Sequence, residues 1–173
     1  MGSNTIGKRF SVTSFGESHG KHIGVVIDGF PANVKIDEDF IQAALDRRRP
    51  GQSALTTQRN ESDRMEITTG VFEGKSTGAP ITILIPNKDQ RPEDYDHLKE
   101  VYRPSHADYT YEKKYGHRDH TGGGRSSARV TAGWVAAGAL AETYLIDQYN
   151  IELSAWVSQV YDVQFTKEEY ATK

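Results

Sequence analysis

The sequence contains no cysteine, and this absence removes three kinds of chemistry at once. Without thiols the chain can form no disulfide framework, no thiolate metal site and no cysteine nucleophile. It also has no apolar run that approaches the length of a membrane span, and its N-terminus lacks the apolar segment of a secretory signal. These absences are compatible with a cytoplasmic location, and we expect no membrane partner.

Apolar residues are scarce as well, at 36% of the 173 residues. The length still suffices for one domain with a hydrophobic core, but much of the surface must be loop. No Gly-x-Gly-x-x-Gly follows a predicted strand, so a Rossmann site has no support. The segment Gly74–Thr77 resembles part of a nucleotide-binding P-loop, but the required glycine is missing at position 69, which is Thr. We therefore interpret residues 74–77 as a tight turn between two strands.

The pattern of apolar residues predicts a mixture of strands and helices. A helix should begin after Asp37, bury Ile41, Ala44 and Leu45, and end near Pro50. A long Ala-rich helix should occupy residues 126–148, and shorter helical turns are expected at 94–102 and 106–115. Alternating apolar residues predict strands over residues 9–14, 22–28, 65–72, 80–85 and 151–157.

A glycine-rich loop at residues 122–129 opens the long helix. Its three glycines would let backbone N–H groups converge on an oxyanion, and Ser126 and Ser127 could cap the helix. Arg125 and Arg129 are four residues apart and are expected to share one helical face. Such a helix start favours negative charge, so we expect a phosphate there.

The segment before this loop is locally basic, although the chain as a whole has 21 basic and 24 acidic residues. This pattern suits a confined anionic ligand better than an extended polyanion such as nucleic acid. The arginines at 47–49 are either a solvated helix end or a loop directed at an anion, and the sequence leaves both open. A metal site is not expected, because cations surround the histidines of the basic segment.

Taken together, the motifs of this chain resemble those of the chorismate synthase family. They occur in the family's order, and no single one is decisive. They are Gly-Glu-Ser-His-Gly at 16–20, Arg-Arg-Arg-Pro-Gly-Gln-Ser at 47–53, Thr-Thr-Gln-Arg at 56–59, Gly-Val-Phe-Glu-Gly at 70–74, His-Ala-Asp-Tyr-Thr at 106–110, Lys-Tyr-Gly at 114–116 and Gly-Gly-Gly-Arg-Ser-Ser-Ala-Arg at 122–129.

The resemblance implies an α+β fold, a β-α-β sandwich with helices packed between antiparallel sheets. Members are about twice as long, so residues 1–173 would form the N-terminal portion of the domain, about half of the fold. A capping box at Thr166–Glu169, close to the end of the chain, also suggests truncation. The chain alone is expected to be inactive, and the full-length protein to be a homotetramer.

The implied activity is a lyase reaction that removes phosphate and a hydrogen from 5-enolpyruvylshikimate 3-phosphate by anti-1,4-elimination, yielding chorismate. By resemblance, His19 matches the histidine thought to protonate the reduced flavin, and His106 the one thought to assist phosphate departure. Arg48, Arg103 and Arg129 would hold the phosphate and carboxylates of the substrate. Histidine suits both roles because it exchanges protons near neutral pH.

The family requires reduced FMN, which Arg125, Ser126 and Ser127 would contact, with Ser127 also reaching the substrate. Ala54 stands where many members have an arginine linked to NADPH, which argues against a role for NADPH. Three further positions depart from the usual residues, namely Ser105, Val130 and Trp134. The alternative function is a non-catalytic phosphate- or nucleic-acid-binding module, which would not account for the two histidine motifs.

Overall fold

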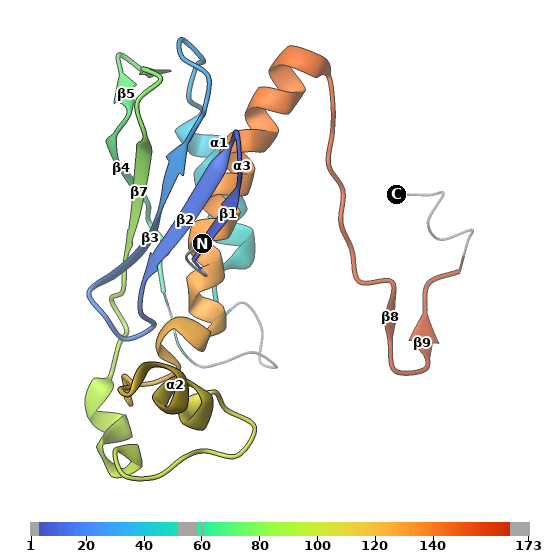
Figure 1. Ribbon diagram of the computed structural model, residues 1–173. Coiled ribbons are helices and arrows are strands. Elements are labelled where there is room, and N and C mark those ends of the chain that lie inside the picture. Colours follow the sequence, from blue (N-terminus) through green and yellow to red (C-terminus); the bar gives the residue numbers. More distant parts are fainter. Residues whose placement is uncertain (1–3, 52–58, 60, 167–173) are drawn as a thin grey trace.

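The structure is a computed structural model in which residues 4–51, 59 and 61–166 are described. Its centre is an antiparallel sheet of five strands in the order β1-β2-β3-β7-β4 (Figure 1). These strands are β1 (Thr5–Gly7), β2 (Ser11–Gly16), β3 (His22–Asp28), β7 (Ile81–Pro86) and β4 (Glu66–Thr69). The strands predicted around 9–14, 22–28 and 80–85 are therefore present, with shifted ends, whereas the strand predicted at 65–72 is divided into β4 and a separate short strand at residues 71–72.

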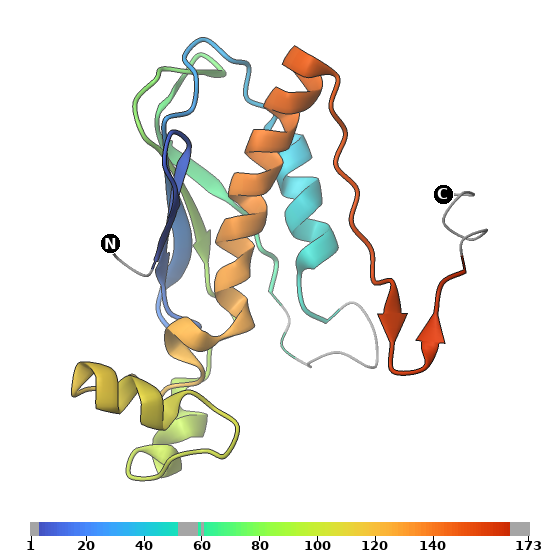
Figure 2. The ribbon, with the colours of Figure 1, turned by 45° about the vertical axis from the view of Figure 1, so that its right-hand side comes forward.

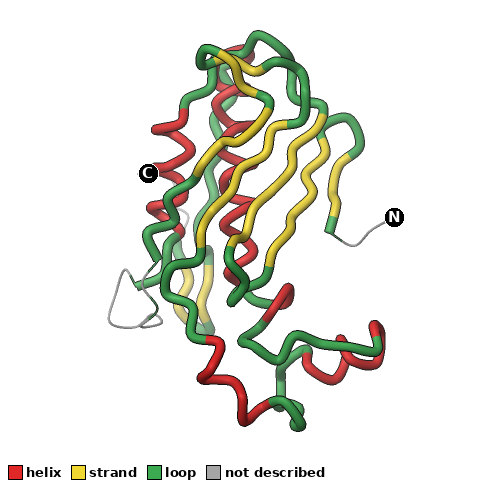
Figure 3. The backbone as a smooth tube through the Cα atoms, turned by 90° about the vertical axis from the view of Figure 1, so that its left-hand side faces the viewer, coloured by secondary structure: helices red, strands yellow, loops and turns green. Residues whose placement is uncertain are grey.

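One face of the sheet is covered by two helices, α1 (Glu38–Arg48) and α3 (Thr131–Tyr149) (Figure 2). Strand alternation places Val25 and Ile27 of β3 on this face together with Ile83 of β7, and all three are fully buried. When the open face of the sheet is turned toward the viewer, both helices lie behind the strands (Figure 3). Burial of this apolar layer against the helices forms the core.

Helix α1 agrees with the sequence pattern that predicts it. The Asp37 carboxylate caps the helix by accepting from the Phe40 N–H at 2.9 Å. Ile41, Ala44 and Leu45 are buried, as expected. The cap residue Asp37 and the buried stripe together fix the direction of the helix, which ends with Arg48 at one end of the sheet.

A tight turn is present near the predicted residues 74–77, but it consists of residues 73 and 74, and residues 75 and 76 belong to a strand. Strands β5 (Val71–Phe72) and β6 (Lys75–Ser76) are joined through Glu73 and Gly74, whose φ angles of 48° and 74° are both left-handed. Two left-handed residues match the twist of a two-residue hairpin turn, and glycine adopts this conformation without strain. The segment therefore has a structural role in the loop between β4 and β7.

Two short helices lie between β7 and α3 at one end of the sheet (Figures 1 and 2). They are the 3₁₀ helix η1 (Pro92–Leu98) and α2 (Asp108–Tyr115), close to the predicted helical turns. The buried Arg118 holds them together, because its Nη2 donates to the carbonyls of Leu98, Lys99 and Val101 at 2.7–2.9 Å and its Nε donates to Glu112 of α2 at 3.2 Å.

The long helix begins later than predicted. Residues 124–130 form two 3₁₀ turns, η2 (Gly124–Ser126) and η3 (Ala128–Val130), separated by Ser127 in an extended conformation with ψ of 143°. The extended residue breaks the helical path, so the expectation that Arg125 and Arg129 share a helical face is wrong. Helix α3 itself starts at Thr131.

The strand predicted at 151–157 is also wrong. These residues form no strand, and every residue from 151 to 166 is exposed. A short hairpin of β8 (Gln159–Val160) and β9 (Val163–Gln164) lies beyond them, apart from the sheet (Figure 1). Alternation makes a segment suitable for a strand, but a strand also needs a neighbouring edge, and no other described strand lies beside it. Of the predicted capping box, residues 167–169 lie outside the described residues.

The described residues thus form one five-stranded antiparallel sheet with one helix layer, together with two short hairpins, which is the mixed helix and antiparallel-sheet class that the sequence predicts. The second sheet of the predicted sandwich is not formed by them. Within the described part of the chain, no helix has both the length and the apolar character needed to cross a bilayer.

Candidate active site

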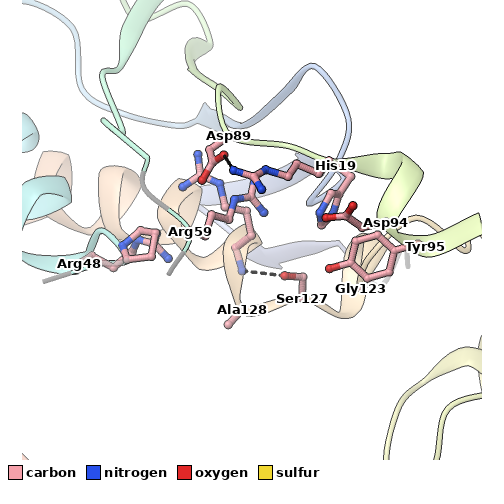
Figure 4. Close-up of a pocket in the computed structure, with 12 residues that line it drawn as sticks. His19, Arg48, Arg59, Asp89, Asp94, Tyr95, Gly123, Ser127 and Ala128 are labelled. Carbon is pink, nitrogen blue, oxygen red and sulfur yellow. Dashed lines mark hydrogen bonds and ion pairs between the residues drawn. The ribbon is translucent and has the colours of Figure 1, made fainter. Parts of the chain in front are cut away.

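Five segments that are distant in the sequence meet at the end of the sheet where α1 ends and α3 begins. They are the β2–β3 turn, the end of α1, the segment that contains Arg59, the residues after β7 and the glycine-rich loop. Between them lies a cavity of about 520 Å³. Figure 4 shows Arg48 and Tyr95 on opposite sides of it, with Arg59 between them. Its wall consists of His19, Arg48, Pro50, Arg59, Asp89, Arg91, Asp94, Tyr95, Gly123, Ser127, Ala128 and Arg129.

Two fully buried carboxylates, Glu61 and Asp63, pair with arginines of this wall. Asp63 accepts a hydrogen bond from Arg48 Nη2 at 2.9 Å through Oδ2 and another from Arg129 Nη1 through Oδ1. Glu61 Oε1 accepts from Arg59 Nη2 at 2.7 Å and from Arg59 Nε at 3.0 Å. Buried charges are tolerated only when they are paired in this way.

The pairing leaves two buried donors without a hydrogen-bond partner among the described residues, Arg129 Nη2 and Arg48 Nε. The Arg129 side chain is only 3% exposed, and its Nη2 lies 3.9 Å from the nearest Glu61 oxygen, which is beyond hydrogen-bond range. A buried donor without a partner costs free energy. Both atoms have almost no exposed surface, so an anion in the cavity would reach them only after the side chains shift, but the arginines of the wall indicate an anionic ligand.

Asn87 joins this arginine cluster to the turn that carries His19. Its Oδ1 accepts from Arg129 Nε at 2.9 Å, and its Nδ2 donates to the carbonyls of Glu17 and Gly20 at 3.0 and 2.7 Å. Both the oxygen and the nitrogen of the Asn87 amide are therefore hydrogen-bonded, and the side chain is almost completely buried. The position of Arg129 relative to His19 is fixed by one amide.

His19 stands in the wall of the cavity, next to the cations. Its Nδ1 lies 3.0 Å from Ser18 Oγ, and its ring meets the Tyr95 ring edge-on with centroids 4.8 Å apart. Gly122 packs so closely on the other side that a Cβ there would overlap the ring. Burial, and then the positive charge of Arg59, lower the pKa of His19 below 6.5. The free site therefore favours a neutral imidazole that an incoming anion can help to protonate.

Arg103 and His106 form a second cluster around the buried Asp108. Arg103 contacts both Asp108 oxygens at 2.8 Å, and His106 Nδ1 lies 2.8 Å from Asp108 Oδ1. The hydrogen bond from Arg103 holds the pKa of Asp108 far below its usual range, and the same contact raises the pKa of Arg103. His106 lines a separate hollow of about 190 Å³, and neither residue belongs to the wall of the larger cavity.

The glycine-rich loop is held by its own hydrogen bonds. Arg125 Nη1 donates to the Gly16 carbonyl at 2.7 Å, and its Nη2 donates to Ser14 Oγ at 2.8 Å. Ser126 Oγ donates to the Gly123 carbonyl at 2.7 Å. The Gly123 N–H is directed at Ser18 Oγ at 3.2 Å, so it is not available to an oxyanion as the glycine pattern suggested.

Of the eight predicted site residues, the structure gathers His19, Arg48, Ser127 and Arg129 in one cavity wall. The other four, namely Arg103, His106, Arg125 and Ser126, lie outside that wall. The sequence interpretation missed four residues that shape the site, namely Arg59, Glu61, Asp63 and Asn87. Arg59 ends a family motif and could have been found; the other three carry no pattern that marks them as buried.

The family model for chorismate synthase matches residues 10–173. A chorismate synthase of Cytophaga hutchinsonii is 57% identical over 164 residues, which cover 95% of this chain and 45% of that protein. One of Bacteroides thetaiotaomicron is 60% identical over 157 residues, covering 91% and 44%. A crystal structure of chorismate synthase superimposes with a TM-score of 0.58 at 32% identity, covering 81% of this chain and 35% of the other. The chain thus spans less than half the length of these relatives.

Proposed function

Because the chain belongs to the chorismate synthase family, we propose that it contributes the phosphate-binding part of an active site that converts 5-enolpyruvylshikimate 3-phosphate to chorismate. The reaction is an anti-1,4-elimination of phosphate, a lyase step of the shikimate pathway. The observation that carries the proposal is a cavity wall with four arginines, three of which (Arg48, Arg59 and Arg129) are fixed by ion pairs with buried carboxylates.

The chemistry of the substrate matches this set. It carries a phosphate and carboxylates, and the departing phosphate gains negative charge in the transition state. Guanidinium groups that are already fixed can stabilise this charge without reorganising. The arginines would also hold the substrate in one orientation, which an anti elimination requires.

We propose His19 as the acid beside the departing phosphate, because it shares the cavity wall with Arg48 and Arg129. The resemblance assigns that role to His106 and flavin protonation to His19. His106 lines a different hollow, so its predicted role requires the substrate to reach past the glycine-rich loop. Comparing His19→Ala and His106→Ala in a full-length member that carries this sequence would separate the two assignments. The variant that loses the phosphate-release step identifies the acid.

Reduced FMN would supply transient electron density for the elimination. The residues predicted to hold it fit only in part, because Ser127 lines the cavity whereas Arg125 and Ser126 donate to the protein itself. We therefore derive no step through the flavin. The need for FMN, a homotetramer and a cytoplasmic location belong to this proposal as expectations from the family, and the Ala54 position still argues against NADPH.

The proposal is tested by titrating 5-enolpyruvylshikimate 3-phosphate into the chain by calorimetry. Arg129→Gln should weaken binding at least about tenfold, since a charged hydrogen-bond donor is lost in a buried place. Arg91→Gln is the matched control, because it removes the same charge from the cavity rim, where the Arg91 side chain is 72% exposed. Equal losses in both variants would contradict a specific site.

The alternative, a nucleic-acid-binding module, makes the opposite prediction for a second titration. Tight binding of a single-stranded oligonucleotide that weakens steeply with added salt would count against the lyase proposal. We expect weak binding, because the cations of the site are confined to a cavity and three of them are already paired with buried carboxylates or carbonyls.

A further inference from the structure

Three of the four arginines in the cavity wall lie close together and would repel one another if nothing held them. Arg48, Arg59 and Arg129 place three positive charges at one end of the sheet, against the two negative charges of Glu61 and Asp63. We propose that Asp63 and Glu61 are positioning residues, which do not contact the substrate but fix the guanidinium groups that do. This inference rests on the proposed function and names the residues that make its site rigid.

The hydrogen bonds of Asp63 are consistent with a positioning role. Each of its oxygens accepts from a different arginine, so neither guanidinium is fully occupied and each keeps N–H bonds for a ligand. Its backbone is left-handed with φ of 46°, a conformation that costs free energy in a residue other than glycine. Gln42 of α1 holds the bend, because its Nε2 donates to the Asp63 carbonyl at 3.2 Å and its Oε1 accepts from the Met65 N–H at 3.1 Å.

Glu61 acts in the same way on Arg59. Beyond the two bonds from Arg59, its oxygens accept from the backbone N–H groups of Lys88 at 2.9 Å and Asp89 at 3.3 Å. Arg59 Nη2 also donates to the Ser18 carbonyl at 2.9 Å, next to His19. The carboxylate is therefore saturated by partners from two chain segments, and Arg59 is held in one orientation against the histidine turn.

Positioning and simple charge effects predict opposite results when Asp63 is neutralised. Asp63→Asn removes a negative charge from beneath the cavity, so electrostatics alone would tighten anion binding. An asparagine amide, however, offers only one oxygen to two arginines and turns an NH2 group toward the other. Released guanidinium groups lose their common geometry, so positioning predicts weaker binding.

The test is a calorimetric titration of inorganic phosphate at fixed ionic strength into the wild-type chain, Asp63→Asn and Asp94→Asn. Asp94 is the charge-matched control, since it lines the same cavity and no hydrogen bond or ion pair with the three arginines involves it. We expect the phosphate Kd to rise at least about tenfold in Asp63→Asn, and to stay equal or fall in Asp94→Asn. Equal Kd values in the two variants would overturn the positioning role.

The wild-type titration separates this inference from the proposed function. If the wild-type chain does not bind phosphate, the proposed function is contradicted in this chain. If the wild-type chain binds and Asp63→Asn binds equally well, only the positioning role fails. A merely structural role would lower the unfolding temperature of Asp63→Asn and leave the phosphate Kd of the folded protein unchanged.

A second measurement uses only the wild-type chain, so it tests the positioning role even if Asp63→Asn does not fold. In the free site the Nε hydrogen of Arg59 donates to Glu61, and an Nη1 hydrogen of Arg129 donates to Asp63. Their exchange with water, followed by 15N NMR of the arginine side chains, should therefore be slow even without phosphate. Exchange as fast as that of the exposed Arg91 would overturn the proposed rigidity.

Discussion

Gly122→Ala tests directly whether the glycine-rich loop sets the position of His19. Gly122 has a left-handed φ of 69°, and an alanine there costs about 1–2 kcal/mol in backbone strain. The new methyl group would also overlap the His19 ring, so the ring must move and its 3.0 Å contact with Ser18 Oγ is lost, at about 1 kcal/mol. We expect the free energy of unfolding to fall by about 2–3 kcal/mol in total.

Urea unfolding and NMR titration of His19 are the assays. The displaced ring leaves its half-buried position, so its pKa should rise toward 6.5 while stability falls. Gly138→Ala is the matched control, because Gly138 lies inside α3 with nothing near its missing Cβ, and alanine should stabilise that helix by up to about 1 kcal/mol. An unchanged stability and an unchanged His19 pKa in Gly122→Ala would refute the packing argument.

Three further changes probe the rest of the framework through urea unfolding. The pKa of His19 in the folded chain lies below 6.5, so between that pKa and 6.5 the unfolded chain binds more protons than the folded one. The free energy of unfolding should therefore fall as the pH drops through this range. His19→Asn should make the free energy of unfolding less dependent on pH in the same range. Asp108→Asn should lower the free energy of unfolding by about 3 kcal/mol, because it removes a carboxylate that pairs with the buried Arg118. A decrease of less than about 1 kcal/mol would contradict this. Gly133→Ala should lower the free energy of unfolding by about 1–3 kcal/mol, since the new Cβ would lie 2.8 Å from Val25 Cγ1. A stabilised variant would show that α3 can move away from β3.

The elements that local chemistry determines could be predicted from the sequence. Asp37 and the buried stripe of Ile41 and Leu45 define α1, and alternation in β3 defines its buried face. The hairpin at Glu73–Gly74 follows from turn chemistry alone. Each of these depends on residues within about ten positions of one another, which is the range over which sequence patterns carry information.

The site was predicted only in part because its contacts are distant in sequence. Ser14, which is 111 residues from Arg125, binds the guanidinium that the helical spacing assigned to a ligand. Asp63 looks like an ordinary charged residue before a strand, yet it is fully buried, and Arg48 at the end of α1 and Arg129 just before α3 both pair with it. Such burial follows from tertiary packing, which no local pattern records. The strand expected at 151–157 fails for the same reason, since a partner edge is a tertiary feature.

The most direct measurement is a crystal structure of this chain with 5-enolpyruvylshikimate 3-phosphate. The proposal predicts that the phosphate oxygens accept from the guanidinium groups of Arg129 and Arg48, with His19 beside them. A phosphate bound instead in the hollow next to His106, without contact to these two arginines, would contradict it.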